Sequence, residues 1–208
     1  MRILGLGHYS RTGKDTLANY FVDFFKDTSI CVLKRSFAWK LKQVTFELYA
    51  WAGMREPEYY ETEEGAKART VVLPAIGKTP IDIWVDFGTP AVRQCVYDRT
   101  WIDYLLKSDL NADMLVIPDV RFPNEVAAIR DMGGILVKVV RPGYGPKNTV
   151  ADRALIGRDV WDYVVGAEGS MKSLDQWAVR LASGFLGVSS MPIQRYEDKM
   201  RALSVEVL

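Results

Sequence analysis

Short apolar runs alternate along the chain with stretches of helical spacing. Five runs have the length and residue types of β-strands, and they lie at 2–7, 29–34, 114–118, 135–140 and 163–165. The run at 2–7 is followed, after a polar loop, by apolar residues at helical spacing. Strands that are apolar on both faces, with helices between them, are typical of a parallel sheet covered by helices on both sides. The pattern therefore predicts an α/β fold.

Helix boundaries can be read at several positions. The stretch "NEVAAIRDMGG" at 124–134 predicts a helix that is closed by glycine. In "FGTPAVRQ", Thr89 is expected as the N-cap and Pro90 as the first helical residue. Residues 54–80 are polar, mixed in charge and irregular, which indicates a substrate-binding insertion rather than a separate domain. We therefore expect a single domain over 1–208.

Composition narrows the class of protein. Hydrophobic residues make up 49% and charged residues 25% of the 208 residues, a globular balance that argues against disorder. The net charge of +1 gives no support for a nucleic-acid substrate. No apolar run approaches the length of a membrane span, and no signal peptide is evident. Cys31 and Cys95 lie in apolar contexts and are expected to be buried thiols, which suits a reducing cytoplasm.

The loop after the first strand carries the first candidate site, "GHYSRTGKDT" at 7–16. It follows a P-loop pattern, with His8 at the position of the first glycine and Asp15 directly after Lys14. Successive backbone N–H groups at a helix N-terminus bind anions, and the lysine reaches the terminal phosphates. Thr16, or Asp15 through a water, can hold Mg²⁺.

Two other interpretations of this loop stay open. One is a dinucleotide fingerprint, Gly5-x-Gly7-x-x-Ser10, which has serine in place of the third glycine and leaves Lys14 unexplained. The other is a strand-turn-helix connection without a ligand. His8, the single histidine of the chain, is expected to serve the loop conformation rather than to titrate.

A second constellation lies in "MLVIPDVRFPNEVAAIRDMGG" at 114–134. An apolar strand delivers Asp119 near its C-terminal end, where open α/β sheets bind ligands. Arg121 follows, and Glu125 lies near the start of the next helix. A carboxylate here suits a Mg²⁺ ion, and an arginine suits phosphate oxygens. The alternative is that Arg121 and Glu125 pair with each other.

Taken together and in this order, the motifs resemble the deoxynucleoside monophosphate kinases of bacteriophages. The resemblance is carried by "GKDT", "FGTPAVRQ", "VIPDVRFPNEVAAIRDMGG", "VKVVRPG" and a late "GS…L", and it runs from about residue 3 to about residue 180. The segment "PDVRFPNE" with the following "RPG" is its most specific part.

The resemblance implies a P-loop kinase fold, a three-layer sandwich around a parallel five-stranded sheet, with a lid around 141–160. It implies that ATP and Mg²⁺ are bound by the first loop, at Gly7, Thr12, Gly13, Lys14, Asp15 and Thr16. It assigns the acceptor nucleotide to Phe37, Lys42, Arg93, Asp119, Arg121 and Glu125, with Asp119 also near the metal. Lys14, Asp15 and Arg121 would be catalytic.

The chain departs from the family in two places. The lid reads "NTVADRAL" at 148–155 where a His-x-Ser-Glu element is usual, which leaves Asp152 as the acidic counterpart. "AEGS" stands at 167–170 in place of Asn-Asp-Gly-Ser. Among the arginines that flank the lid, Arg141, Arg153 and Arg158, the sequence does not choose which one meets the transferring phosphate.

The predicted function is ATP-dependent phosphorylation of deoxynucleoside monophosphates to diphosphates in phage nucleotide metabolism. One alternative keeps the kinase fold but transfers to a hydroxyl, such as that of a modified base in phage DNA, with Asp15 or Asp119 as base. Another is a nucleotide-binding protein without turnover. The expected partners are small nucleotides, in a host-cell cytoplasm if the chain is phage-encoded, and the sequence leaves a homodimer open.

Overall fold

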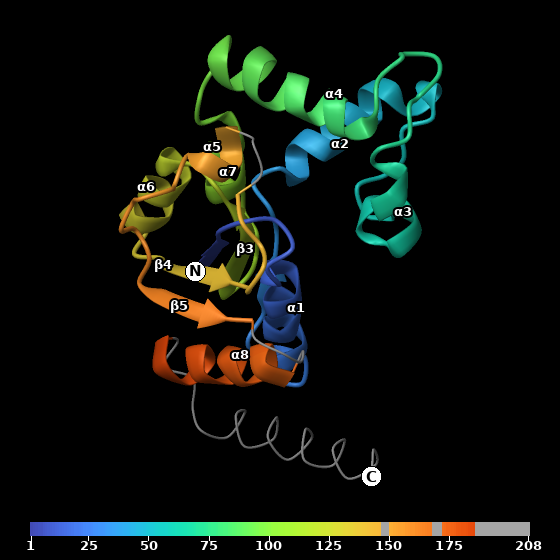
Figure 1. The fold of residues 1–208 in the computed structure, drawn as a ribbon. Coiled ribbons are helices and arrows are strands. Elements are labelled where there is room, and N and C mark those ends of the chain that lie inside the picture. The colour runs from blue at the N-terminus through green and yellow to red at the C-terminus, as the bar shows by residue number, and fades with distance from the viewer. Residues whose placement is uncertain (147–149, 168–171, 186–208) are drawn as a thin grey trace, which may run out of the picture. The chain divides into compact units, whose positions relative to one another are not determined.

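The computed structural model describes residues 1–146, 150–167 and 172–185 (Figure 1). Residues 186–208, most of the "AEGS" element and the side chain of Asp152 lie outside the described residues. The chain forms two compact units, one made of Met1–Ser36 and Leu110–Leu208 and the other of Phe37–Asp109. The insertion expected at 54–80 lies within the second unit.

The first unit is built on a five-stranded parallel sheet, as the sequence predicts. The strands are β1 (Arg2–Gly7), β2 (Val32–Lys34), β3 (Met114–Val120), β4 (Ile135–Val140) and β5 (Tyr163–Gly166). Their order is β2-β3-β1-β4-β5, and every pairing is parallel. β2 is shorter than the run expected at 29–34. The predicted α/β class is confirmed.

One face of the sheet is covered by α1 (Lys14–Phe25) and α8 (Lys172–Phe185) (Figure 1). The core there joins fully buried side chains of both helices to alternate residues of the strands, such as Leu6 and Val137. The phenol of Tyr20 on α1 is hydrogen-bonded to the carboxylate of Asp175 on α8. Burial and this carboxylate raise the pKa of the Tyr20 phenol.

The opposite face carries α6 (Pro123–Asp131). The short α7 (Val150–Arg153) follows β4 along the chain. α6 packs against β1 and β4, with Ile129 fully buried. It ends as predicted, because Gly133 adopts a left-handed backbone (φ 69°) that stops the helix. Helices thus cover both faces of the sheet, which is the predicted three-layer arrangement.

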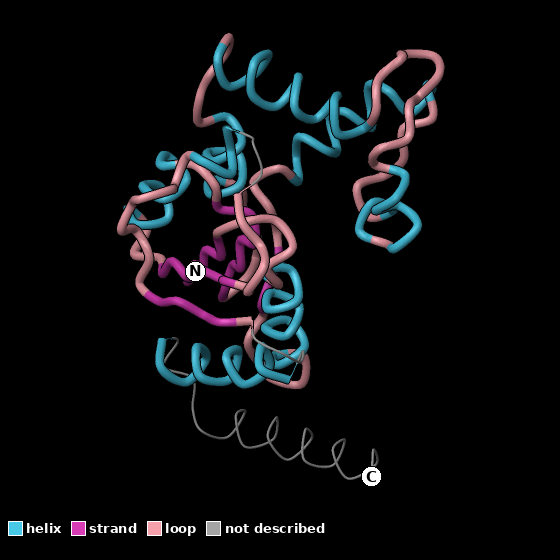
Figure 2. The backbone as a smooth tube through the Cα atoms, viewed as in Figure 1, coloured by secondary structure: helices cyan, strands magenta, loops and turns pink. Residues whose placement is uncertain are grey.

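The second unit contains helices and loops among its described elements (Figure 2). The longer helices are α2 (Trp39–Tyr49), α3 (Glu63–Ala68), α4 (Pro80–Asp86), η3 (Phe87–Gln94) and α5 (Thr100–Lys107). Two short turns, η1 (Ala50–Ala52) and η2 (Tyr59–Glu61), lie between α2 and α3.

The helix start predicted at Thr89 is wrong, because the helix begins one Thr-Pro pair earlier. The hydroxyl of Thr79 accepts the backbone N–H of Asp82, whose carboxylate accepts the backbone N–H of Thr79 at 3.0 Å. The Thr79 hydroxyl also donates to this carboxylate at 2.6 Å, and the hydrogen bonds from the hydroxyl and from the backbone N–H of Thr79 lower the pKa of Asp82. Three residues after Thr89 stands Val92, which cannot complete such a capping box. The chain therefore continues from α4 into the π-helical η3 with Thr89 inside it.

Two further observations bear on the class of protein. Cys31 and Cys95 are both exposed and form no disulfide, so the prediction of buried thiols is wrong. Cys31 directly precedes β2, the strand at one edge of the sheet, where its apolar neighbours do not enclose it. Within the described ranges, no helix is long and apolar enough to cross a membrane.

We predict that Gly65→Ala destabilises the chain by about 1–3 kcal/mol, a usual cost of overpacking. A Cβ at Gly65 would lie 1.9 Å from the carbonyl oxygen of Tyr59, a backbone atom that cannot rotate away. Urea unfolding followed by circular dichroism measures the change. Gly145→Ala is the matched control, since nothing lies within 4 Å of its added Cβ. Equal free energies of unfolding for the two variants would contradict the packing described for α3.

Candidate phosphate-binding site

The loop between β1 and α1 has an unusual backbone. His8, Arg11 and Gly13 all adopt left-handed conformations, with φ of 102°, 63° and 99°. Such conformations cost free energy in residues that carry a side chain, and they are found mostly at turns and functional sites. Alternation of left- and right-handed residues turns successive N–H groups toward one point, which makes a concave anion site.

Two side chains fasten this loop to its own backbone. The hydroxyl of Thr12, which is fully buried, donates to the carbonyl oxygen of Tyr9 at 3.0 Å. The ammonium group of Lys14 donates to the same carbonyl, and only 5% of Lys14 is exposed. The lysine is therefore held within the loop, at the first residue of α1. Because Gly13 has no side chain, it places no capping group over the N-terminus of that helix.

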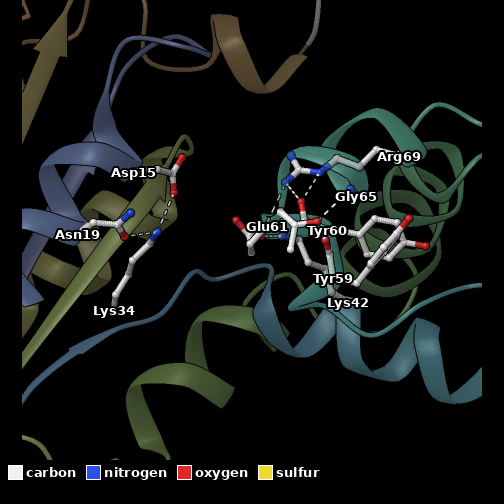
Figure 3. Close-up of polar contacts among 10 residues, drawn as sticks. Asp15, Asn19, Lys34, Lys42, Tyr59, Tyr60, Glu61, Gly65 and Arg69 are labelled. Atoms are coloured by element: carbon white, nitrogen blue, oxygen red, sulfur yellow. Dashed lines mark hydrogen bonds and ion pairs between the residues drawn. The ribbon is translucent and has the colours of Figure 1, made fainter. Parts of the chain in front are cut away.

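Asp15 is held by Lys34 of β2. Its carboxylate forms an ion pair of 3.3 Å with Lys34, whose ammonium also donates to the Asn19 side chain at 2.9 Å (Figure 3). The side chain of Asp15 is 69% exposed, so it stands at the surface directly after Lys14. Sequence reasoning missed Lys34, although its place at the C-terminal end of a parallel strand is a usual signal for ligand-side residues.

At the end of β3, Asp119 is half-buried and Arg121 follows the strand. The carboxylate of Glu125, which is 5% exposed, accepts the backbone N–H of Arg121 at 2.7 Å and that of Phe122 at 3.0 Å. Glu125 thus fixes the turn that carries Arg121 and satisfies amides at the start of α6.

A cavity of about 350 Å³ lies in the first unit. It is lined by the start of the loop, by Arg121, by Lys138 of β4 and by residues of the segment 151–161. Trp161 of that segment lies against Gly7, since a Cβ on Gly7 would be 2.2 Å from the indole ring. Gly7 therefore admits the ring, a contact that the P-loop pattern does not predict.

In the second unit, Lys42 forms an ion pair of 2.8 Å with Glu61 and lies 5.5 Å over the ring of Trp84. Arg69 also approaches Glu61, at 3.8 Å, and donates to the carbonyl oxygen of Tyr60 (Figure 3). Lys42 and Glu61 thus belong to one network of opposite charges.

The other two residues of the second unit that were predicted to contact the acceptor are less accessible. Phe37 is 4% exposed, so its ring presents no open face for a base. The side chain of Arg93 is 10% exposed and forms an ion pair of 3.2 Å with Asp98. Both would have to move, or exchange a partner, to contact a ligand.

The predicted site residues therefore fall into two groups. The first unit brings together Gly7, Thr12, Gly13, Lys14, Asp15, Thr16, Asp119, Arg121 and Glu125. The second unit carries Phe37, Lys42 and Arg93. In the part of the chain that the structure describes, no three histidine, cysteine or acidic side chains gather as a metal cluster.

Comparison with known proteins adds to this geometry. No family model matches the chain. Over 162 residues, the chain is 28% identical to a putative deoxynucleotide monophosphate kinase of Acanthamoeba polyphaga mimivirus, which covers 72% of this chain and 79% of that protein. Over 74 residues it is 36% identical to the deoxynucleotide monophosphate kinase of Enterobacteria phage T4, covering 35% of this chain and 30% of that protein. The chain is thus similar to two viral proteins that are named deoxynucleotide monophosphate kinases. The resemblance predicted from the motifs is confirmed.

We predict that Glu125→Ala lowers the free energy of unfolding by about 2–3 kcal/mol, because two amides near the start of α6 lose a charged acceptor. Glu125→Gln keeps one acceptor oxygen and should lose less. Urea denaturation of each variant measures the effect. Glu47→Ala, an exposed glutamate on α2, is the control and should stay within about 0.5 kcal/mol of the parent chain. A Glu125→Ala variant as stable as the control would contradict the capping role.

Proposed function

We propose that the chain transfers the γ-phosphoryl group of ATP to deoxynucleoside monophosphates. The observation that carries the proposal is the left-handed loop that holds Lys14 at the N-terminus of α1, beside the strand end that bears Asp119. The names of the relatives support a kinase. A dinucleotide site would leave the nearly buried Lys14 without a role.

On the donor side, the loop amides and the N-terminus of α1 would bind the phosphate oxygens of ATP. A helix N-terminus stabilises an anion by about 0.3–1 kcal/mol when exposed, and by up to about 2 kcal/mol when partly buried. Lys14 adds a full positive charge in a nearly buried position, where water screens it little. The γ-phosphate would take the ammonium of Lys14 from the Tyr9 carbonyl that now accepts it.

The residues present fit Mg²⁺ as a nucleotide-bound ion. Mg²⁺ in phosphoryl-transfer sites keeps several waters and is held by substrate phosphates with one or two protein oxygens, so a cluster of acidic side chains is not required. Asp15, Thr16 and Asp119 supply oxygens at the loop and at the neighbouring strand end. When bound, the ion would neutralise charge on the phosphates. Lys34 would position Asp15 for that role through their ion pair.

On the acceptor side, Arg121 would contact the monophosphate, held in place by the turn that Glu125 fixes. In the second unit, Lys42 and Arg93 are proposed contacts for nucleotide phosphate, and Phe37 would have to leave its buried position to contact a base. An acceptor phosphate is already an anion near pH 7, so no strong base is needed. Catalysis would rest on positioning and on stabilisation of the charge that develops on the transferring group.

We expect that the chain, incubated with Mg-ATP and single deoxynucleoside monophosphates including modified pyrimidines, forms ADP and the matching diphosphate. Lys14→Ala should reduce the rate on the order of 100-fold or more, because the charge on the transferring phosphate loses its main cation. Chromatography of the nucleotides measures both products. Lys26→Ala, an exposed lysine just after α1, is the matched control and should keep the rate.

Each other outcome leads to a different function. ADP formed only when DNA is supplied would move the acceptor to a nucleic-acid hydroxyl. Nucleotide binding with no transfer to any acceptor would replace the kinase by a nucleotide sensor. A rate that survives Lys14→Ala would mean that the activity does not come from this loop.

A further inference from the structure

The cavity of the first unit opens on the face of the sheet opposite α1 and α8. Side chains alternate along a strand, so Lys138 and Val164 point away from the face that buries their neighbours Val137, Val139 and Val165. None of Thr12–Thr16 lines the cavity, although His8 and Tyr9 do. The cavity therefore borders the start of the loop and lies apart from Lys14 and the first turn of α1, which would hold the donor phosphates.

Lys138 gives this cavity a cation that the fold does not neutralise. It is half-buried on a strand whose adjacent residues, Val137 and Val139, are fully buried. Among the side chains that the structure describes, which do not include that of Asp152, none forms a hydrogen bond or ion pair with its ammonium group. A lysine in a partly desolvated position without a partner costs free energy, which an anionic ligand would recover.

Positive charges also outnumber negative ones among the other charged side chains that line the cavity. Arg121 and Arg158 line it together with Lys138, against the single carboxylate of Asp159. Arg158 is exposed, and its Nε donates to the carbonyl oxygen of Ala154, which leaves the remaining guanidinium donors directed elsewhere. The net charge of the lining is positive, which favours a ligand with phosphate groups.

The apolar part of the lining suits a planar group. The indole of Trp161 lies against the backbone of Gly7 and forms part of the wall. Ile156 and Val164, which also line the cavity, are 50% and 56% exposed. Apolar side chains gathered at the rim of a cationic cavity are typical of ligand sites, and a nucleobase stacks well on an indole.

We propose that this cavity is a second nucleotide-binding site, in which Lys138 binds a phosphate and Trp161 contacts the base. Its volume of about 350 Å³ lies in the range of small-molecule sites. This goes beyond the proposed function, because neither Lys138 nor Trp161 is among the residues proposed to contact the donor or the acceptor; Arg121 alone is shared with the acceptor. The site does not require the chain to be a kinase.

The test follows the emission of Trp161 while dGMP, dTMP, dTTP, ADP and inorganic pyrophosphate are titrated separately into the full chain without Mg²⁺. Subtracting the signal of the Trp161→Phe variant isolates this indole from the other tryptophans. At least one nucleotide should change the emission to saturation. Its Kd should stay within about 3-fold in Lys14→Ala and rise at least about 10-fold in Lys138→Met, the loss of roughly one charged contact.

Two control variants test whether the positive charge at position 138 is responsible for the binding. Lys138→Arg keeps the charge and should bind within about 3-fold of the parent chain, whereas Lys26→Met removes an exposed lysine elsewhere and should have no effect. If Lys138→Met does not fold, Lys138→Gln replaces it, and its thermal midpoint verifies the fold.

Four results would overturn the proposal. The first is no emission change with any nucleotide, and the second is loss of the change in Lys14→Ala, which would merge the cavity with the donor site. The third is pyrophosphate binding as tightly as every nucleotide, which would leave an anion site without base contact. The fourth is a rise in the KM of the acceptor by the same factor as the Kd in Lys138→Met, which would make the cavity the acceptor's own pocket.

Discussion

The parallel pairing of β1 with β3 is the constraint on which the candidate site depends. Gly7, the last residue of β1, is in register with Val120, the last residue of β3. The loop that follows one strand and the Asp119–Arg121 segment of the other are thereby brought to the same edge of the sheet. Neither segment alone forms a phosphotransfer site. The pairing turns two motifs more than 100 residues apart into one place with lysine, arginine and carboxylate groups.

Around this edge, buried polar groups hold short segments in fixed conformations. The carbonyl of Tyr9 accepts from Thr12 and Lys14, and the carboxylate of Glu125 accepts two backbone amides. Each of these bonds lies within a few residues of the chain, so the segments that would meet the phosphates are shaped locally. Preorganised groups of this kind need little rearrangement when charge develops in a reaction. Preorganisation also explains the strained backbone at His8 and Arg11, because the hydrogen bonds within the loop hold it in that conformation.

Much of the fold could be predicted because it rests on signals of short range. The alternation of apolar strands and helices gave the five parallel strands, and the glycines at 133–134 gave the end of α6. The start of α4 was missed because the sequence contains two Thr-Pro pairs that can begin a helix. The residue three positions after each threonine distinguishes them, because Asp82 completes a capping box and Val92 does not. The exposure of Cys31 was missed because the position of a strand at the sheet edge depends on pairing order, which local pattern does not contain.

In the candidate site, too, some residues could be predicted from local pattern and others depend on the order of the strands. The loop and the Asp119–Arg121 segment carry recognisable spacings, whereas Lys34 and Lys138 are single lysines in apolar strands. Their contact with Asp15, or with a cavity, arises from which strand lies beside which. A hydrophobic pattern treats such lysines as interruptions, and only the sheet order shows what they face.

The most direct test of the central claim is amide hydrogen exchange, measured by mass spectrometry with and without Mg-ADP. The account predicts slower exchange in peptides that cover 8–17, where the loop and the first turn of α1 would bind phosphate, and no such change in peptides over 80–86 of α4. Lys14→Ala should lose most of the protection. Unchanged exchange over 8–17 at saturating nucleotide, or protection that survives Lys14→Ala, would contradict the claim that this loop holds the phosphates.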